Sequence, residues 1–301
     1  MNRILVIRGG AIGDFILTLP AIRLLREGFP SGRLEILGYE HIVRLAEMSG
    51  YADAVRSIEF GPLSSFFCRD ASLAPELVEY FSHFHQVISY LFDPDQIFAS
   101  NLRRAGVRHL ISGSPKISGQ EHAARQLARP LESLALYLRD PAARLLPNEK
   151  RNPDANLFAI HCGSGSENKN WPLDRVMRLT KSLLEQNEER RLLLVAGEAD
   201  ESRSKQLEES LSPDRIQLAK NLPLTRLANL LQNCACFVGH DSGISHLAAA
   251  VGTPSLLLFG PTDPAIWAPQ NPQVRVLQAR SRKMEGISLP KVLDSLGELT
   301  S

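Results

Sequence analysis

The sequence has almost no net charge, few cysteines and no long apolar run. Its 34 basic and 33 acidic residues leave a formal charge of +1, which is too small to draw the whole molecule to nucleic acid. We therefore predict no nucleic-acid partner. Cys68, Cys162, Cys234 and Cys236 form no C-x-x-C pair and no spacing typical of a secreted disulfide framework. A reducing compartment fits this pattern best.

Two further absences concern membranes. No apolar stretch reaches the roughly 18 to 20 residues that span a bilayer, and the first residues lack the basic start and cleavage site of a signal peptide. Both predict a cytoplasmic protein. A local basic excess can be either a solvated helix face or a contact for an anionic acceptor or membrane surface. Its members are Arg103, Arg104, Arg108, Lys116, Arg125, Arg129, Arg139, Arg144, Lys150 and Arg151.

The length and composition predict a folded chain of two domains. The 301 residues are 44% apolar and 22% charged, as in an ordinary globular protein, and one domain takes roughly 150 residues. The segment Pro141 to Pro153 is rich in proline, asparagine and charge, which is typical of a linker. We therefore expect domains at 1–150 and 151–301 with a cleft between them.

Both halves alternate between strand and helix patterns, which predicts α/β domains with parallel sheets. The first half begins with a strand at Arg3–Arg8, a helix from Asp14 to about Gly28 and a strand at Leu34–Leu37. Gly61–Ala74 has no clear period and is expected to be a loop. The expected strands that follow are 86–92, 107–112, 157–161, 191–196, 216–218, 236–239 and 255–259, and the expected helices are 173–186, 201–210, 224–233, 245–251 and 289–299. The last of these helices could pack back on the first domain.

Three polar, glycine-rich loops directly follow expected strands, where ligands bind in open parallel sheets. The first, Gly9–Asp14, reads G-G-x-x-G rather than the G-x-G-x-x-G of dinucleotide-binding proteins, so a nicotinamide cofactor is disfavoured. Gly10 and Gly13 would let the backbone approach a ligand. Asp14 can either cap the following helix or accept a proton from an acceptor hydroxyl.

The second loop runs from His161 to Pro172 and combines small residues with a lysine. Ser164 and the neighbouring backbone N–H groups, followed by Lys169, could form a diphosphate pocket, although a plain solvated loop is the alternative. Lys169 lacks the G-K-[ST] ending of a Walker A motif, which disfavours ATP hydrolysis. The segment also lacks the G-x-S-x-G order of the nucleophile elbow that carries the serine of α/β-hydrolases, which disfavours a hydrolase.

The third loop, Gly239–His246, again joins a strand to a helix. Asp241 and Ser242 can cap that helix, and their N–H groups with that of Gly243 would form an anion site. His246 could contact phosphate or orient the loop. The spacing of His240, Asp241 and His246 does not ensure that their side chains converge on one metal ion, so we expect no metal.

At these residues the sequence resembles glycosyltransferase family 9, the bacterial ADP-heptose:lipopolysaccharide heptosyltransferases. The resemblance rests on the stretch from Ile4 to Asp14 with Leu19-Pro20-Ala21, on Lys169-x-Trp-Pro172, on Gly197 with Glu201, and on Asp241-Ser-Gly-Ile-Ser-His246. Ser245 departs from a usually apolar position. The middle of the first domain offers no recognisable acceptor signature.

The resemblance implies the GT-B architecture, with two facing Rossmann-like domains, the acceptor mainly on the first and the nucleotide sugar mainly on the second. It implies Asp14 as general base, Lys169 at the donor phosphates and Glu201 at the ribose. Ser164, Asp241, Ser242, Gly243 and His246 complete the expected donor site.

The activity implied is an inverting transfer of heptose from ADP-heptose to a lipopolysaccharide core or related glycan, without a cofactor. A glycolipid acceptor would allow peripheral contact with the inner membrane surface. Two alternatives stay open, namely a nucleotide-sugar epimerase of similar build and a non-catalytic nucleotide-sugar-binding protein.

Overall fold

The computed structural model describes residues 2–197 and 200–300. The chain divides into two compact units, Met1–Pro141 and Ala142–Ser301. The boundary precedes the one suggested by the linker composition, because Ala142 and Leu145 are buried and the Leu145 N–H donates to the Ala250 carbonyl in the second unit.

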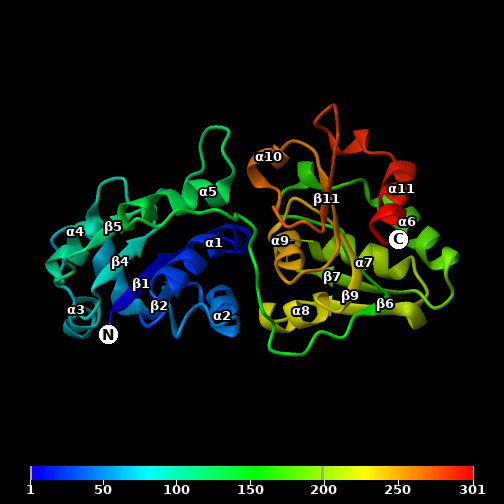
Figure 1. The fold of residues 1–301 in the computed structure, drawn as a ribbon. Helices are drawn as coiled ribbons and strands as arrows, with labels where there is room; N and C mark the ends of the chain where they lie inside the picture. The colour runs from blue at the N-terminus through cyan, green and yellow to red at the C-terminus, as the bar shows by residue number, and fades with distance from the viewer. Residues whose placement is uncertain (1, 198–199, 301) are drawn as a thin grey trace. The chain divides into compact units, whose positions relative to one another are not determined.

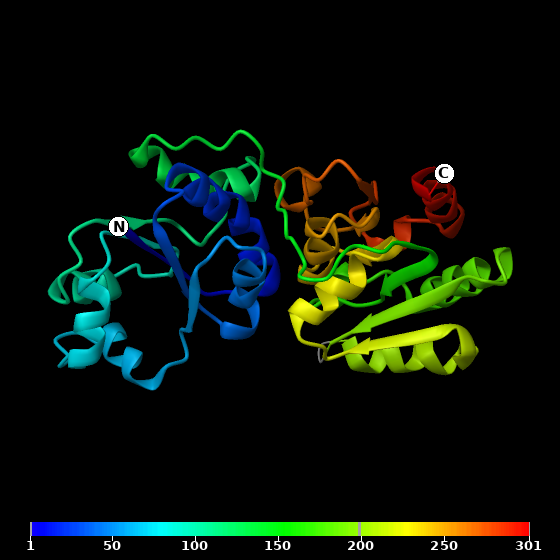
Figure 2. The same cartoon turned by 60° about the horizontal axis from the view of Figure 1, so that its bottom comes forward.

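The first unit is a parallel sheet of order β3-β2-β1-β4-β5 with helices between its strands. Figures 1 and 2 show the helices packed against the strands. Leu5 and Ile7 of β1 lie in a core cluster with Phe66, Phe81 and Val87. The elements are β1 (Arg3–Arg8), α1 (Ile12–Gly28), β2 (Arg33–Gly38), α2 (Glu40–Met48), β3 (Ala54–Ser57), η1 (Gly61–Phe67), α3 (Pro75–Ser82), β4 (Gln86–Ser89), α4 (Ile97–Arg104), β5 (Leu110–Ser112), α5 (Ala123–Ala128) and η2 (Arg129–Leu134).

The second unit is a parallel sheet of order β11-β10-β9-β6-β7-β8. Its core gathers apolar residues of every central strand. Its elements are β6 (Asp154–His161), η3 (Glu167–Lys169), α6 (Leu173–Gln186), β7 (Arg191–Ala196), α7 (Glu201–Glu209), η5 (Pro213–Arg215), β8 (Ile216–Lys220), α8 (Leu224–Leu231), β9 (Cys234–His240), α9 (Gly243–Ala250), β10 (Ser255–Phe259), α10 (Pro264–Trp267), β11 (Val274–Gln278), η6 (Met284–Gly286) and α11 (Leu289–Thr300).

Both strand orders are Rossmann-like and confirm the expected α/β class. In each sheet the order reverses beside the unit's first strand, between β1 and β4 and between β6 and β9. Ligands of doubly wound sheets bind at the carboxyl ends of the strands at this reversal. The loops after β1, β6 and β9 are the three glycine-rich loops of the sequence, so the topology places them at the expected binding edges.

Two expectations about local structure in the first unit were wrong. Helix α1 begins at Ile12, so Gly13 lies in its first turn rather than in a loop, and Gly61–Phe67 forms the 3-10 helix η1. The C-terminal helix α11 buries Val292 and Leu296 in the core of the second unit. The basic stretch from Arg103 to Arg151 is divided between the two units and is therefore no single surface of either.

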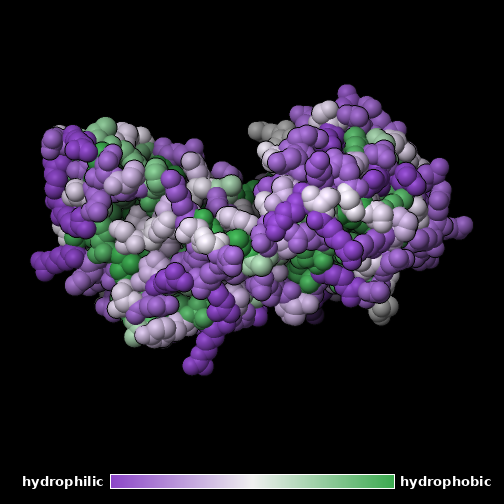
Figure 3. All heavy atoms as spheres, turned by 90° about the horizontal axis from the view of Figure 1, so that it is seen from above, coloured by the Kyte–Doolittle hydropathy of each residue, from purple (hydrophilic) through white to green (hydrophobic). Residues whose placement is uncertain are grey.

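No described helix is both long and apolar enough to cross a membrane. Figure 3 shows one face of the molecule, on which hydrophilic residues predominate and hydrophobic ones form smaller patches.

Candidate functional site

The N-terminus of α9 is the centre of the site in the second unit. Ser242 is the N-cap residue, and its Oγ accepts a hydrogen bond from the Ser245 N–H at 3.3 Å. The first N–H groups of a helix have no partner within the helix and carry its partial positive charge. The predicted cap by Ser242 is confirmed, and Ser242 and Gly243 occupy a position suited to an anion, whose binding there stays a prediction.

Asp241 does not cap α9, although the sequence offered both Asp241 and Ser242 as capping residues. Its Oδ2 lies 2.8 Å from the Nζ of Lys169, which comes from the loop after β6. The side chain of Asp241 is 10% exposed and that of Lys169 is 30% exposed. This ion pair joins the second and third loops, and it leaves the side chain of Lys169 partly exposed.

A chain of polar contacts lies beneath the same helix end. Ser242 Oγ is 3.3 Å from Nδ1 of His161, and Nε2 of His161 is 3.4 Å from Oδ2 of Asp200. Both His161 and Asp200 are buried. Burial alone would raise the pKa of Asp200, but the interaction with His161 and a hydrogen bond from the Gly197 N–H hold it below its usual value.

Sequence reasoning did not identify His161 or Asp200 as functional. The glycine at position 163 was the available sign that another segment lies close to this loop, because a Cβ at this position would lie 2.1 Å from the Cβ of Asp200. Only glycine lets the loop after β6 come this close to Asp200.

The neighbouring histidine, His240, is enclosed. Its Nε2 accepts a hydrogen bond from the Trp171 N–H at 3.1 Å, and burial, followed by the proximity of His161, lowers its pKa to about 3. His240 is therefore neutral near pH 7 and positions Trp171 in the loop after β6 that carries Lys169.

The other expected donor residues have varied surroundings. Ser164 is buried, and its hydroxyl lies 2.8 Å from the Asn170 Oδ1, within its own loop. His246 is buried in the first turn of α9. Glu201 lies 2.5 Å from the Nζ of Lys220, and both line a cavity of about 340 Å³ beside α7 and β8. The hydrogen bond from Lys220 lowers the pKa of Glu201.

Asp14 lies in the first unit at the carboxyl end of β1. Its Oδ2 accepts a hydrogen bond from the Ala11 N–H at 3.0 Å, and its Oδ1 is 3.8 Å from the guanidinium of Arg8. Gly10 has a φ of +101°, and a Cβ there would lie 2.9 Å from the Asp14 Oδ2. Asp14 thus helps to cap α1, but its side chain is 42% exposed and still accessible to a ligand.

Arg8 is a further residue that sequence reasoning missed. It is 4% exposed, its Nε donates to the Thr18 hydroxyl, and its terminal nitrogens donate to the carbonyls of Tyr90 and Asp14. Burial lowers its pKa, while the proximity of Asp14 opposes that shift. A charged residue directly after the four apolar residues of β1 was the signal for it.

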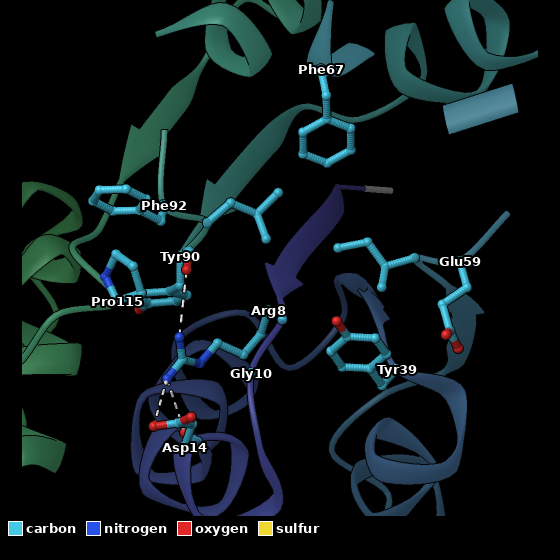
Figure 4. Close-up of a pocket in the computed structure, with 12 residues that line it drawn as sticks. Arg8, Gly10, Asp14, Tyr39, Glu59, Phe67, Tyr90, Phe92 and Pro115 are labelled. Atoms are coloured by element: carbon cyan, nitrogen blue, oxygen red, sulfur yellow. Dashed lines mark hydrogen bonds and ion pairs between the residues drawn. The ribbon is translucent and has the colours of Figure 1, made fainter. Parts of the chain in front are cut away.

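Asp14 and Arg8 line a cavity of about 510 Å³ in the first unit (Figure 4). Its other side chains include Tyr39, Glu59, Phe67 and Phe92. The volume is within the ~300 to 1,000 Å³ typical of small-molecule sites. Within the described ranges 2–197 and 200–300, no group of three or more His, Cys, Asp and Glu side chains is placed to hold a metal ion.

Two Rossmann-like units with glycine-rich loops at both strand-order reversals define the GT-B fold class. The sequence model of glycosyltransferase family 9 (heptosyltransferase) matches residues 118–295. The chain belongs to this family.

Individual relatives agree with this assignment. The chain is 33% identical over 128 residues to lipopolysaccharide heptosyltransferase 1 of Campylobacter coli, a match covering 41% of this chain and 37% of the relative. The chain spans less than half the length of the curated relatives that it matches.

Two solved structures share the fold along the whole chain. A family 9 glycosyltransferase from Veillonella parvula has a TM-score of 0.81 at 19% identity, covering 99% of this chain and 97% of the other. The ADP-heptose lipopolysaccharide heptosyltransferase II of E. coli has a TM-score of 0.79 at 16% identity, covering 100% and 98%.

Proposed function

We propose that this chain is an inverting glycosyltransferase that moves heptose from ADP-heptose onto a lipopolysaccharide core or related glycan. The observation that carries the proposal is the N-terminus of α9, where the capped helix end adjoins the Lys169–Asp241 pair. A helix N-terminus and a lysine together suit a diphosphate. The name of the family supports heptose as the transferred sugar, and the names of two similar proteins, a lipopolysaccharide heptosyltransferase and an ADP-heptose lipopolysaccharide heptosyltransferase, support the acceptor and donor classes.

The donor site stabilises the charge that develops on the leaving diphosphate. As the bond between the anomeric carbon and the diphosphate oxygen breaks, both electrons stay with that oxygen. The Lys169 ammonium and the N–H groups of Ser242 and Gly243 offer fixed positive charge for it. Such an interaction accelerates the reaction because it is stronger in the transition state than in the ground state.

Asp14 is the proposed general base. Its carboxylate would take the proton of the acceptor hydroxyl while the hydroxyl oxygen bonds to the anomeric carbon. The Ala11 N–H and Arg8 fix the orientation of the carboxylate, which is what a base must have to meet a positioned hydroxyl.

His161 and Asp200 are proposed to position Ser242 rather than to form a hydrolase triad. The Ser242 oxygen already accepts from the Ser245 N–H and lies 3.2 Å from the Ser245 hydroxyl. It therefore belongs to the helix cap, and Ser242 would serve the diphosphate rather than attack an acyl carbon. Glu201 is proposed to hold the ribose, with Lys220 fixing its carboxylate.

The scheme uses no cofactor and no metal, and its partners are a nucleotide sugar and a glycan or glycolipid. A glycolipid acceptor would place the protein in the cytoplasm at the inner membrane surface. This location belongs to the proposal.

Product analysis by mass spectrometry tests the proposed function. The protein is incubated with ADP-heptose, and in parallel with GDP and UDP sugars, with and without deacylated lipopolysaccharide core. We expect a heptose adduct of the core and release of ADP only when both substrates are present. An isomerised nucleotide sugar without acceptor would identify an epimerase instead, and binding of ADP-heptose without any product would identify a binding protein.

A further inference from the structure

Arg203 on α7 donates three hydrogen bonds to the loop after β6. Its Nε donates to the Cys162 carbonyl at 3.0 Å, and one terminal nitrogen donates to the Trp171 carbonyl at 2.6 Å. The other terminal nitrogen lies 3.1 Å from a carboxylate oxygen of Glu167. All three acceptors belong to the second glycine-rich loop, which runs from His161 to Pro172. One side chain of α7 therefore fixes this loop near both of its ends and in its middle.

Lys169 lies between these contacts. Glu167 stands two residues before it and Trp171 two residues after it. An arginine guanidinium binds several acceptors at once in a fixed plane, which a lysine ammonium on its flexible chain does not. Arg203 therefore fixes the backbone on both sides of Lys169, and from that place the Lys169 ammonium reaches Asp241.

Hydrogen bonds inside the loop tie its residues together. The Ser164 hydroxyl donates to the Asn170 Oδ1 at 2.8 Å, and the Asn170 Nδ2 donates to the Glu167 Oε2 at 3.2 Å. The other oxygen of Glu167 accepts from Arg203. A loop with such internal bonds shifts as one body, so a change in its attachment to α7 would displace Lys169 as well.

The two carbonyl contacts contribute more to this attachment than the ion pair. The Glu167 side chain is 82% exposed, and exposed ion pairs contribute little to stability. The Arg203 side chain is 17% exposed, and its bonds to the carbonyls of Cys162 and Trp171 are partly buried. Loss of the guanidinium would leave these carbonyls without that partner, which is costly for a buried group.

Helix α7 also carries the residue proposed to hold the ribose. Glu201 is the first residue of α7 and pairs with Lys220. Arg203 lies in the same first turn, two residues further along. Glu201 and Lys169, which are proposed to contact the ribose and the diphosphate, are thus both tied to the start of α7. Their separation sets the distance between the two contacts.

From these contacts we propose that Arg203 is a positioning residue of the donor site, which holds the loop that carries Lys169 at the distance from Glu201 that a nucleoside diphosphate needs. Arg203 acts through Lys169, because its own guanidinium nitrogens are engaged by the loop. The inference rests on the proposed transferase function and adds to its donor site a residue outside the three glycine-rich loops.

Titration calorimetry of Arg203→Lys with ADP and with adenosine tests this role. Lysine keeps the positive charge but loses the planar fork, so the loop and Lys169 lose their fixed place. ADP should bind about 3- to 30-fold more weakly, whereas the affinity for adenosine, which lacks the diphosphate, should not change. Unchanged ADP affinity would overturn the inference, and so would an equal loss for adenosine. Failure of the unchanged protein to bind ADP would instead count against the proposed function itself.

A double-mutant cycle with Lys169→Met shows whether Arg203 acts through Lys169. In the Lys169→Met protein the loop no longer carries the charge that Arg203 positions, so Arg203→Lys should change ADP affinity by less than about 2-fold in that background. Arg203→Gln, a second variant that keeps a donating amide without the fork, should give the same pattern. An equal factor with and without Lys169 would refute the positioning role, because independent groups contribute additively.

Arg215→Lys is the matched control. Like Arg203, Arg215 donates to three acceptors of the second unit, the carbonyls of Leu184, Asn187 and Glu188. It directly precedes β8, at the amino end of the sheet, whereas the donor loops follow the carboxyl ends of the strands. Arg215→Lys should therefore leave ADP affinity unchanged, with thermal unfolding comparing the stability of the variants. A loss of ADP affinity equal to that in Arg203→Lys would show a general loosening of the unit and overturn the assignment.

Discussion

Replacing Lys169 by methionine removes the positive charge next to the N-terminus of α9 but keeps the length of the side chain. In the protein the ammonium lies 2.8 Å from the Asp241 carboxylate and is partly exposed. A hydrogen bond to a charged group contributes about 1.5 to 3 kcal/mol, so ADP should bind about 10- to 150-fold more weakly to Lys169→Met. Asp241, 10% exposed, would also lose its partner and repel the diphosphate.

Titration calorimetry with ADP and with adenosine measures this effect. Adenosine lacks the diphosphate, so its affinity should not change in Lys169→Met. The double variant Lys169→Met with Asp241→Asn should recover part of the lost ADP affinity, because it removes the unpaired carboxylate. Lys181→Met is the control, since Lys181 is 74% exposed and, among the described residues, pairs with Glu185 on α6. Unchanged ADP affinity, or an equal loss for adenosine, would refute the phosphate role.

Three further substitutions test the framework of the donor site. Ser242→Ala removes the cap of α9 and should lower the free energy of unfolding by about 1 kcal/mol, seen in urea unfolding, and should also weaken ADP binding. Gly163→Ala should destabilise by about 1 to 3 kcal/mol through its clash with Asp200, whereas Gly165→Ala, with nothing within 4 Å of the added Cβ, should not; equal effects would contradict the close approach. His240 has its pKa lowered to about 3, so the unfolded state binds more protons below its ordinary value of about 6.5 and stability should fall as the pH drops through that window. The glutamine of His240→Gln keeps an acceptor for the buried Trp171 N–H. The midpoint temperature of thermal unfolding should fall less steeply in this variant than in the unchanged protein as the pH drops below about 6.5. An identical pH profile would contradict the lowered pKa of His240.

The regular elements that the sequence predicted well have either one buried apolar face or a buried apolar run. Helix α6 and strands β7 and β10 match their expected bounds, since each presents a clear apolar period or an apolar run. Strands β3 and β11 were not predicted; both are sheet edges, and most of their residues are only partly buried. Such strands lack the apolar run that signals a central strand.

The candidate site was predictable where it depends on one loop and not where it depends on contacts between loops. The cap by Ser242 follows from local spacing before α9. The contacts from Lys169 to Asp241 and from His161 to Asp200 join residues far apart in the sequence. Strand order brings these loops together, so a single sequence does not reveal such pairs.

The most direct test of the account is the turnover and donor affinity of Asp14→Asn, measured together. Asparagine retains an oxygen that can accept from the Ala11 N–H but loses the charge beside Arg8, so a thermal unfolding measurement controls for stability. The account predicts unchanged affinity for ADP in calorimetry and a fall in kcat of about 100-fold or more, as for loss of a general base. Near-normal turnover by a folded Asp14→Asn protein would contradict the central claim.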